Sequence, residues 1–145
     1  MTRIYLAAIA DGEQVDALTS FTDKDRLPSV LISFHYLKNF NKRHGLDRIL
    51  SGGHRTMLDS GAYSAWTLGK KIDMNKLIAE AKTGRWAEVV ALDEIGDAEK
   101  SVRNAETMAA AGLDVMPVFH FGDPWDVLVE YKKKYRKIGL SCCLG

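Results

Sequence analysis

The chain has 145 residues, 46% of them hydrophobic, which is enough for one folded domain with its own core. Its 20 basic and 19 acidic side chains leave a formal net charge of +1, which excludes the strong overall positive field of a dedicated nucleic-acid coat protein. No linker or low-complexity tract divides the sequence, so we expect residues 1–145 to form a single domain.

The sequence lacks the patterns of a secretory signal and of a membrane span. Its first apolar run, residues 4–10, is short and is followed at once by acidic residues, and no stretch approaches the roughly 20 apolar residues that cross a bilayer. Cys142 and Cys143 are neighbours whose side chains would point to opposite faces of a strand, which disfavours an ordinary disulfide. These features favour the reducing cytoplasm and no membrane partner.

Apolar runs typical of strands alternate with amphipathic segments typical of helices. The expected strands cover residues 3–10, 29–34, 56–59, 88–94, 114–120 and 137–141. The expected helices cover residues 35–43, 74–82, 98–111 and 124–131, and a surface connection or short helix precedes residue 26. Asp73, Asp97 and Asp123 are the expected helix N-caps.

Continuous apolar strands that alternate with helices indicate a parallel sheet covered by helices, which is an α/β fold. From the third strand onward the units recur about every 25 to 30 residues. An open doubly wound sheet and a (β/α) barrel both fit this pattern. Counting the strands favours the TIM-barrel-like architecture, with about six of the eight strands that a closed barrel needs. We therefore expect an incomplete barrel, with the open sheet as the alternative.

Polar side chains recur at the carboxyl ends of the expected strands. They are His35, Tyr36, Asp59, Ser60, Asp93, Glu94, His120 and Ser141. These strand ends share one face of a parallel sheet or barrel, so the side chains are expected to meet in one pocket. Each also has a simpler interpretation: Asp59 as the acceptor of a local turn, and His120 as a core histidine. Their clustering nevertheless predicts an active site.

Metal binding has weaker support in the sequence. Asp59, Asp93, His35 and His120 are candidate ligands of a mixed nitrogen and oxygen site, but they form no short-range ligand motif. The sequence also lacks a glycine-rich phosphate loop. We therefore assign no metal or cofactor, and a barrel hydrolase or lyase that uses Asp59, Asp93 and His120 around a divalent metal is kept as an alternative function.

Several segments resemble the tRNA-guanine transglycosylase family, in the same order along the chain. Leu58-Asp59-Ser60-Gly61-Ala62-Tyr63 is similar to the family's TDSGGF motif, and residues 30–37 to its second strand, which ends in N-T-Y-H-L. Residues 89–94 resemble its V-M-x-F-D-E strand. Phe119-His120-Phe121-Gly122 falls at V-Q-G-G, with His120 in place of glutamine, and residues 139–145 resemble G-G-L-A-V-G, from which Ser141-Cys142-Cys143 departs.

This resemblance implies a role for each matching residue. Asp59 would be the acid/base catalyst, and Asp93 would bind the Watson–Crick edge of guanine. The other substrate-binding residues would be Ser60, Gly61, Tyr63, Glu94, His120 and Tyr36, with Tyr36 or Tyr63 stacked on the base. The target nucleotide would have to be single-stranded or flipped out, because a duplex hides the glycosidic carbon.

The implied reaction is the exchange of guanine for a 7-deazaguanine derivative in nucleic acid, which makes the protein a glycosyltransferase. Asp-Ser-Gly-Ala-Tyr-Ser, Asp-Glu-Ile-Gly-Asp and Pro-Val-Phe-His-Phe-Gly look closer to the phage and bacterial DNA-modifying branch than to the tRNA enzymes. We therefore favour DNA over tRNA as the partner. The expected location is the cytoplasm, which is the host's if the protein is encoded by a virus.

The chain also departs from the family. There, an aspartate on the eighth strand is the nucleophile, and a structural zinc site follows. The sixth expected strand is the last in this chain, so the resemblance implies the base-recognition part without the nucleophile or the zinc site, completed by a partner chain or as a homodimer. Whether the chain is itself an enzyme is left open, and a non-catalytic fragment that binds nucleic acid or a partner is the third reading.

Overall fold

The computed structural model describes residues 3–7, 9, 12–21, 23, 27–42 and 45–141. Cys142 and Cys143 lie outside these ranges, as do residues 8 and 10 of the expected first strand and residue 43 of the expected helix that follows the second. Among the helices that the structure describes, none has the length and apolar character needed to cross a membrane.

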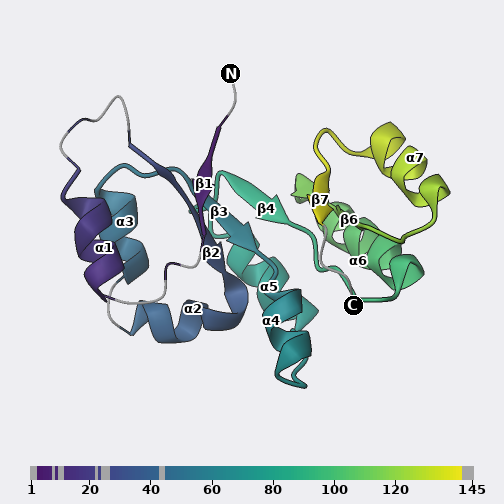
Figure 1. The fold of residues 1–145 in the computed structure, drawn as a ribbon, viewed down its shortest axis with the longest axis horizontal. Helices are drawn as coiled ribbons and strands as arrows, with labels where there is room; N and C mark the ends of the chain where they lie inside the picture. The colour runs from purple at the N-terminus through teal and green to yellow at the C-terminus, as the bar shows by residue number, and fades with distance from the viewer. Residues whose placement is uncertain are drawn as a thin grey trace.

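Short strands alternate with helices along the described chain (Figure 1). The strands are β1 (Tyr5–Leu6), β2 (Ser29–Ser33), β3 (Thr56–Asp59), β4 (Glu88–Val90), β5 (Val115–Met116), β6 (Val118–His120) and β7 (Gly139–Ser141). The helices are α1 (Gly12–Thr19), α2 (Phe34–Asn41), α3 (Gly45–Ser51), α4 (Ala62–Thr67), α5 (Met74–Ala81), α6 (Ala98–Ala110) and α7 (Trp125–Lys134).

The strands pair in chain order and all run parallel. β1 to β5 form one sheet in the order β1-β2-β3-β4-β5, and β6 pairs with β7 in a second, two-stranded sheet. We expected residues 114–120 to form one strand, but Pro117 separates β5 from β6, since proline has no N–H to donate to a ladder. The α/β class is confirmed, and the described strand order contains no reversal.

One face of the sheet is apolar and covered by helices. Paired residues of parallel strands point to the same face, and one such row is Ile32, Leu58, Val89 and Val115. On β2 it packs against buried residues of α1 to α3, and on β3 to β5 against those of α4 to α6. Each large side chain buried in this way contributes about 1.5 to 3 kcal/mol. The helices α1 to α6 therefore lie on the same side of the sheet.

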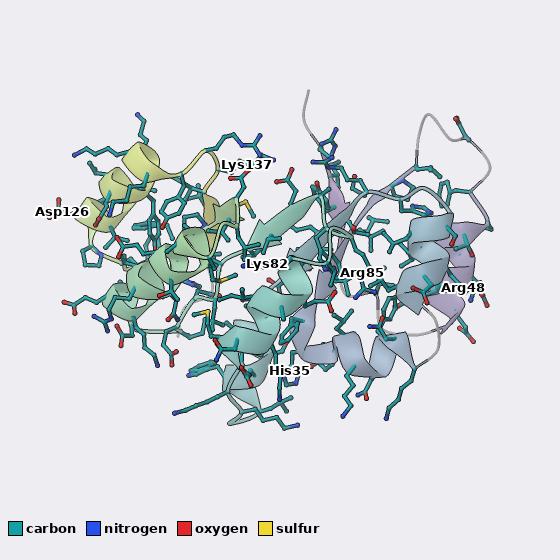
Figure 2. The ribbon with its side chains drawn as sticks, turned by 180° about the vertical axis from the view of Figure 1, so that it is seen from behind. His35, Arg48, Lys82, Arg85, Asp126 and Lys137 are labelled. Carbon is teal, nitrogen blue, oxygen red and sulfur yellow. The ribbon has the colours of Figure 1, made fainter. Side chains whose placement is uncertain are left out.

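The opposite face carries charged residues at both ends of the strands. Where the strands begin, Arg55 donates hydrogen bonds to Glu88 (2.8 Å) and to the Tyr5 hydroxyl (3.1 Å), and Lys137 donates to the same Glu88 oxygen. Asp59 lies on this face at the other end of β3. Figure 2 labels Lys137 near the edge where the strands begin and His35 near the opposite edge.

The helix caps agree with the sequence in two cases and differ in a third. The Asp73 and Asp97 side chains accept hydrogen bonds from the N–H groups of Lys76 and Lys100, as expected of N-caps. Asp123 does not cap α7: its carboxylate accepts the backbone N–H of His120 instead, at 2.9 Å. This aspartate therefore belongs to the turn that follows β6.

Candidate functional site

Side chains from four strand ends meet around one cavity. Its volume is about 190 Å³, and it is lined by Asp59, Ser60, Ala62, Tyr63, Asp93, Ile95, Val118, His120 and Ser141. Apart from Val118, which begins β6, these residues follow or end β3, β4, β6 and β7. Parallel pairing places these ends at one edge of the fold, which is why residues far apart in sequence converge there. Of the eight side chains expected to meet, Asp59, Ser60, Asp93, His120 and Ser141 line this cavity.

Asp93 is the centre of the polar contacts in this cavity. The Ser60 hydroxyl donates to Asp93 Oδ1 at 3.0 Å, and His120 Nε2 lies 2.8 Å from Asp93 Oδ2. Ser60 and His120 thus bind opposite oxygens of one carboxylate. A serine nucleophile would need the histidine on its own hydroxyl, so this arrangement is suited to holding a carboxylate in place and not to activating Ser60.

His120 is fixed from two sides. Its ring contacts Asp93, and its backbone N–H donates to Asp123 Oδ2, which closes the turn after β6. Among the described residues, no hydrogen-bond partner faces its buried Nδ1. The sequence did not indicate this contact of Asp123 with His120, because an aspartate before Pro124 is also the usual pattern of a helix cap. Asp123 positions His120 and does not itself line the cavity.

Asp59 ends β3 beside the Asp93 cluster. Burial raises the pKa of its carboxyl above the usual range, and the hydrogen bond that it accepts from Gly61 N–H (2.9 Å) opposes this rise. The negative charge of Asp93 raises the pKa of Asp59 further. Asp59 is therefore both the acceptor of a local turn and a carboxyl group whose protonated form the site favours. This is the environment that acid/base catalysis uses.

Gly61 shapes the strand end and is not a lining side chain. Its φ of +76° is in the left-handed region, and an added Cβ would lie 2.7 Å from both the Cβ and the backbone nitrogen of His35. The loop after β3 therefore runs directly against the start of α2. The role expected for Gly61 is that of a spacer between two strand ends, because only glycine fits there.

Besides Gly61, two more of the predicted substrate-binding residues lie outside the cavity. Glu94 forms an ion pair with Lys100 at 2.8 Å and lines a neighbouring groove of about 440 Å³. Tyr36 is partly exposed on α2, where its ring meets that of His35 edge to face at 4.7 Å between centroids. Tyr63 does line the cavity, so of the two candidate stacking tyrosines it is the one beside the Asp93 cluster.

The described residues contain no group of three His, Cys, Asp or Glu side chains arranged to hold a metal ion. Asp59, Asp93 and His120 come together, but Asp93 is engaged by Ser60 and His120. His35, the fourth candidate ligand, does not line the cavity.

Comparison with protein-family models, curated proteins and solved structures finds no match to this chain. The resemblance to the transglycosylases therefore depends on the short motifs and their order alone.

Proposed function

We propose that this domain recognises the base in the exchange of guanine for a 7-deazaguanine derivative in nucleic acid. The observation that carries the proposal is the cluster of Ser60, Asp93 and His120 beside Asp59, in a cavity that Tyr63 also lines. These residues occupy the positions at which the chain resembles the transglycosylase motifs. DNA is the favoured polymer, because the motifs look closer to the DNA-modifying branch.

The two carboxylates suit different steps of this reaction. A carboxylate has about four lone-pair sites, and Ser60 and His120 occupy two of those on Asp93, which leaves acceptors for the two adjacent N–H groups of guanine. Asp59, with its raised pKa, retains a proton more readily than an ordinary aspartate and can donate it to the departing base. Tyr63 is half exposed and can stack on the base.

The strand order supports a (β/α) barrel over a doubly wound sheet. In a doubly wound sheet the strand order reverses at a switch point, and the helices then cover both faces. The described strands follow one another in chain order, and α1 to α6 pack on one face. We propose that the described strands belong to a (β/α) barrel.

The direct test is base binding by the chain itself. Calorimetric titration should detect guanine and 7-deazaguanine but not adenine, which has no ring N–H beside its amino group to pair with the free acceptors of Asp93. Asp93→Asn should abolish this preference, whereas Asp126→Asn, an exposed aspartate on α7, should leave it unchanged. Equal binding of guanine by wild type and Asp93→Asn would contradict the role of Asp93.

The second test is exchange of radiolabelled guanine into DNA and tRNA, with purified chain whose mass and oligomeric state are known. Exchange that survives both Asp59→Ala and Asp93→Ala would refute the assigned roles. Stoichiometric metal in active protein would favour the barrel hydrolase or lyase instead. Stable binding of nucleic acid or of a partner, without binding of any base, would favour the non-catalytic reading.

A further inference from the structure

The groove that contains Glu94 begins at the wall of the cavity. Ala62, Asp93 and Ile95 line both the cavity and the groove, so the two spaces are separated only by these residues. Beyond them the groove runs between the end of α4 and the start of α6 and is lined by Trp66, Lys70, Lys71, Lys100 and Asn104. A nucleic-acid strand whose base occupied the cavity would have this groove beside it.

Two neighbouring aromatic side chains line the cavity and the groove, one in each. Tyr63 lines the cavity and Trp66 lines the groove, and both belong to α4. Their ring centroids are 6.0 Å apart and the rings are tilted by 38°, while each side chain is about half exposed (50% and 49%). Large aromatic side chains are usually buried further than this. The free ring surface of Trp66 is available for stacking beside whatever contacts Tyr63.

The charged residues of the groove leave two lysines unpaired. Lys100 is neutralised by its ion pair with Glu94, and Asp93 is engaged by Ser60 and His120. Lys70 and Lys71 are exposed, and neither side chain has a hydrogen-bond or ion-pair partner among the described residues. Lys70 and Lys71 therefore give the groove unpaired positive charge, although the net charge of the chain is only +1.

We propose that this groove binds the single strand next to the exchanged nucleotide. A neighbouring base stacks on Trp66, and Lys70 and Lys71 contact the phosphates that follow. This inference rests on the proposed function, because it places the exchanged base in the cavity. Stacked aromatic rings beside lysines are the usual means of binding single strands without sequence preference. A duplex does not fit this mode, since its bases are already stacked on one another.

Fluorescence anisotropy with a labelled 12-nucleotide DNA strand tests the groove. We expect Trp66→Ala to weaken binding about fivefold or more, which is the lower range for loss of one stacked base. The matched control is Trp125→Ala, which removes an exposed tryptophan of α7 outside the groove and should leave the affinity unchanged. An RNA strand of the same sequence shows whether the sugar matters, and a hairpin duplex should bind more weakly.

The salt dependence of binding tests the lysines. The double variant Lys70→Gln/Lys71→Gln should lower the slope of log affinity against log salt by about 1.4, from roughly 0.7 for each phosphate contact on a single strand. Lys132→Gln/Lys133→Gln removes the same charge from exposed positions of α7 and should not change the slope. If poly-glutamate displaces the DNA strand equally well from wild type and from Trp66→Ala, the ligand of the groove is instead an acidic polypeptide.

The results separate this inference from the proposed function. If single-strand binding is tight and depends on Trp66 and Lys70, but the protein shows no preference for guanine, the proposal for the groove stands and the proposed base exchange is refuted. If guanine binds in the cavity, but wild type and Trp66→Ala bind the single strand equally well, the proposed function stands and the proposal for the groove is refuted. Absence of strand binding by the wild-type protein, or equal binding of duplex, overturns the groove as well.

Discussion

His120 Nε2 lies 2.8 Å from Asp93 Oδ2, although the two residues are 27 positions apart, with Asp93 after β4 and His120 at the end of β6. Both side chains are nearly buried, with exposed fractions of 12% for His120 and 10% for Asp93. In the neutral imidazole, Nε2 carries the hydrogen that Asp93 accepts, which leaves Nδ1 as an acceptor. The carboxylate therefore fixes both the orientation and the tautomer of the histidine.

Removal of Asp93 should destabilise the protein. Asp93→Ala leaves the buried Ser60 hydroxyl and His120 Nε2 without their acceptor, and hydrogen bonds to a charged group contribute about 1.5 to 3 kcal/mol each. We expect a loss of about 2 to 4 kcal/mol in the free energy of unfolding, measured with urea at pH 7. Asp126→Ala removes an exposed carboxylate in the first turn of α7 (Figure 2) and should change it by less than about 1 kcal/mol.

A double-mutant cycle separates the pair from the rest of the cluster. If Asp93 and His120 interact as the geometry indicates, the losses caused by Asp93→Ala and His120→Ala should fail to add by about 1 to 3 kcal/mol. Additive losses would mean that the contact contributes nothing to stability.

Asp59→Asn should stabilise the protein at neutral pH. Because burial raises the pKa of Asp59 in the folded state, the native protein holds this proton more tightly than the unfolded chain. The resulting stability is complete below the unfolded pKa and is lost as the pH rises through the folded pKa. The asparagine variant has no such loss. Its free energy of unfolding should therefore exceed that of the wild type at pH 7, and the difference should shrink towards pH 3.

The size of this difference measures the pKa shift, since one unit corresponds to about 1.36 kcal/mol. Asp126→Asn, which removes an exposed carboxylate of α7, serves as the matched control. If Asp59→Asn and wild-type protein have parallel stability profiles from pH 3 to pH 8, then Asp59 titrates normally and the acid role proposed for it loses its support.

Glu88 should have the opposite pH dependence, although it lies on the same face of the sheet as Asp59. Burial alone would raise its pKa, but hydrogen bonds from Lys137 and Arg55 outweigh burial, so the pKa is lowered. Its contribution to stability is present above the unfolded pKa and is lost as the pH falls through the folded one. Glu88→Gln should destabilise the protein at pH 7 by about 1 to 3 kcal/mol, because a charged acceptor is lost.

Acid titration of both proteins, followed by circular dichroism, checks this prediction. The difference between wild type and Glu88→Gln should shrink as the pH falls through the lowered folded-state pKa of Glu88, and an unchanged difference at low pH would contradict it. Glu99→Gln on α6 is a suitable control, because Glu99 is 88% exposed and its only ion pair with a described residue is a 3.6 Å contact to Arg103.

The strands and the convergence of their ends could be predicted from the sequence because the information is local. Apolar runs such as residues 29–33 and 56–59 give the buried strands, and parallel pairing brings Asp59, Asp93 and His120 to one edge of the fold. The helix caps at Asp73 and Asp97 could also be predicted from the sequence, since each side chain accepts a hydrogen bond from an N–H only three residues away.

The features that could not be predicted from the sequence are the short helices and the contacts between residues distant in the chain. The short helices α3 and α4 escaped prediction, because their helical periodicity is too brief and α4 begins at a left-handed glycine without a side-chain cap. Glu94 and Asp93 are adjacent in the sequence, yet only Asp93 is bound by Ser60 and His120. Glu94 forms an ion pair with Lys100 in the groove instead. That choice depends on tertiary packing.

Gly61→Ala should be among the most destabilising single substitutions on this edge of the fold. A non-glycine residue at positive φ costs about 1 to 2 kcal/mol by itself. At Gly61 the new methyl group would also meet the Cβ and backbone nitrogen of His35 at 2.7 Å, so β3 or α2 would have to shift. We expect a loss of about 3 kcal/mol or more in the free energy of unfolding, since overpacking adds about 1 to 3 kcal/mol.

Gly69→Ala separates the two contributions. Gly69 also has a positive φ, +62°, but nothing lies within 4 Å of the position of an added Cβ, so only the backbone cost of about 1 to 2 kcal/mol should appear. Urea unfolding of the two variants side by side measures the difference. Equal losses would show that the loop after β3 does not press against α2. A larger loss for Gly61→Ala, accompanied by weaker guanine binding, would show that the contact between these strand ends sets the position of Asp59.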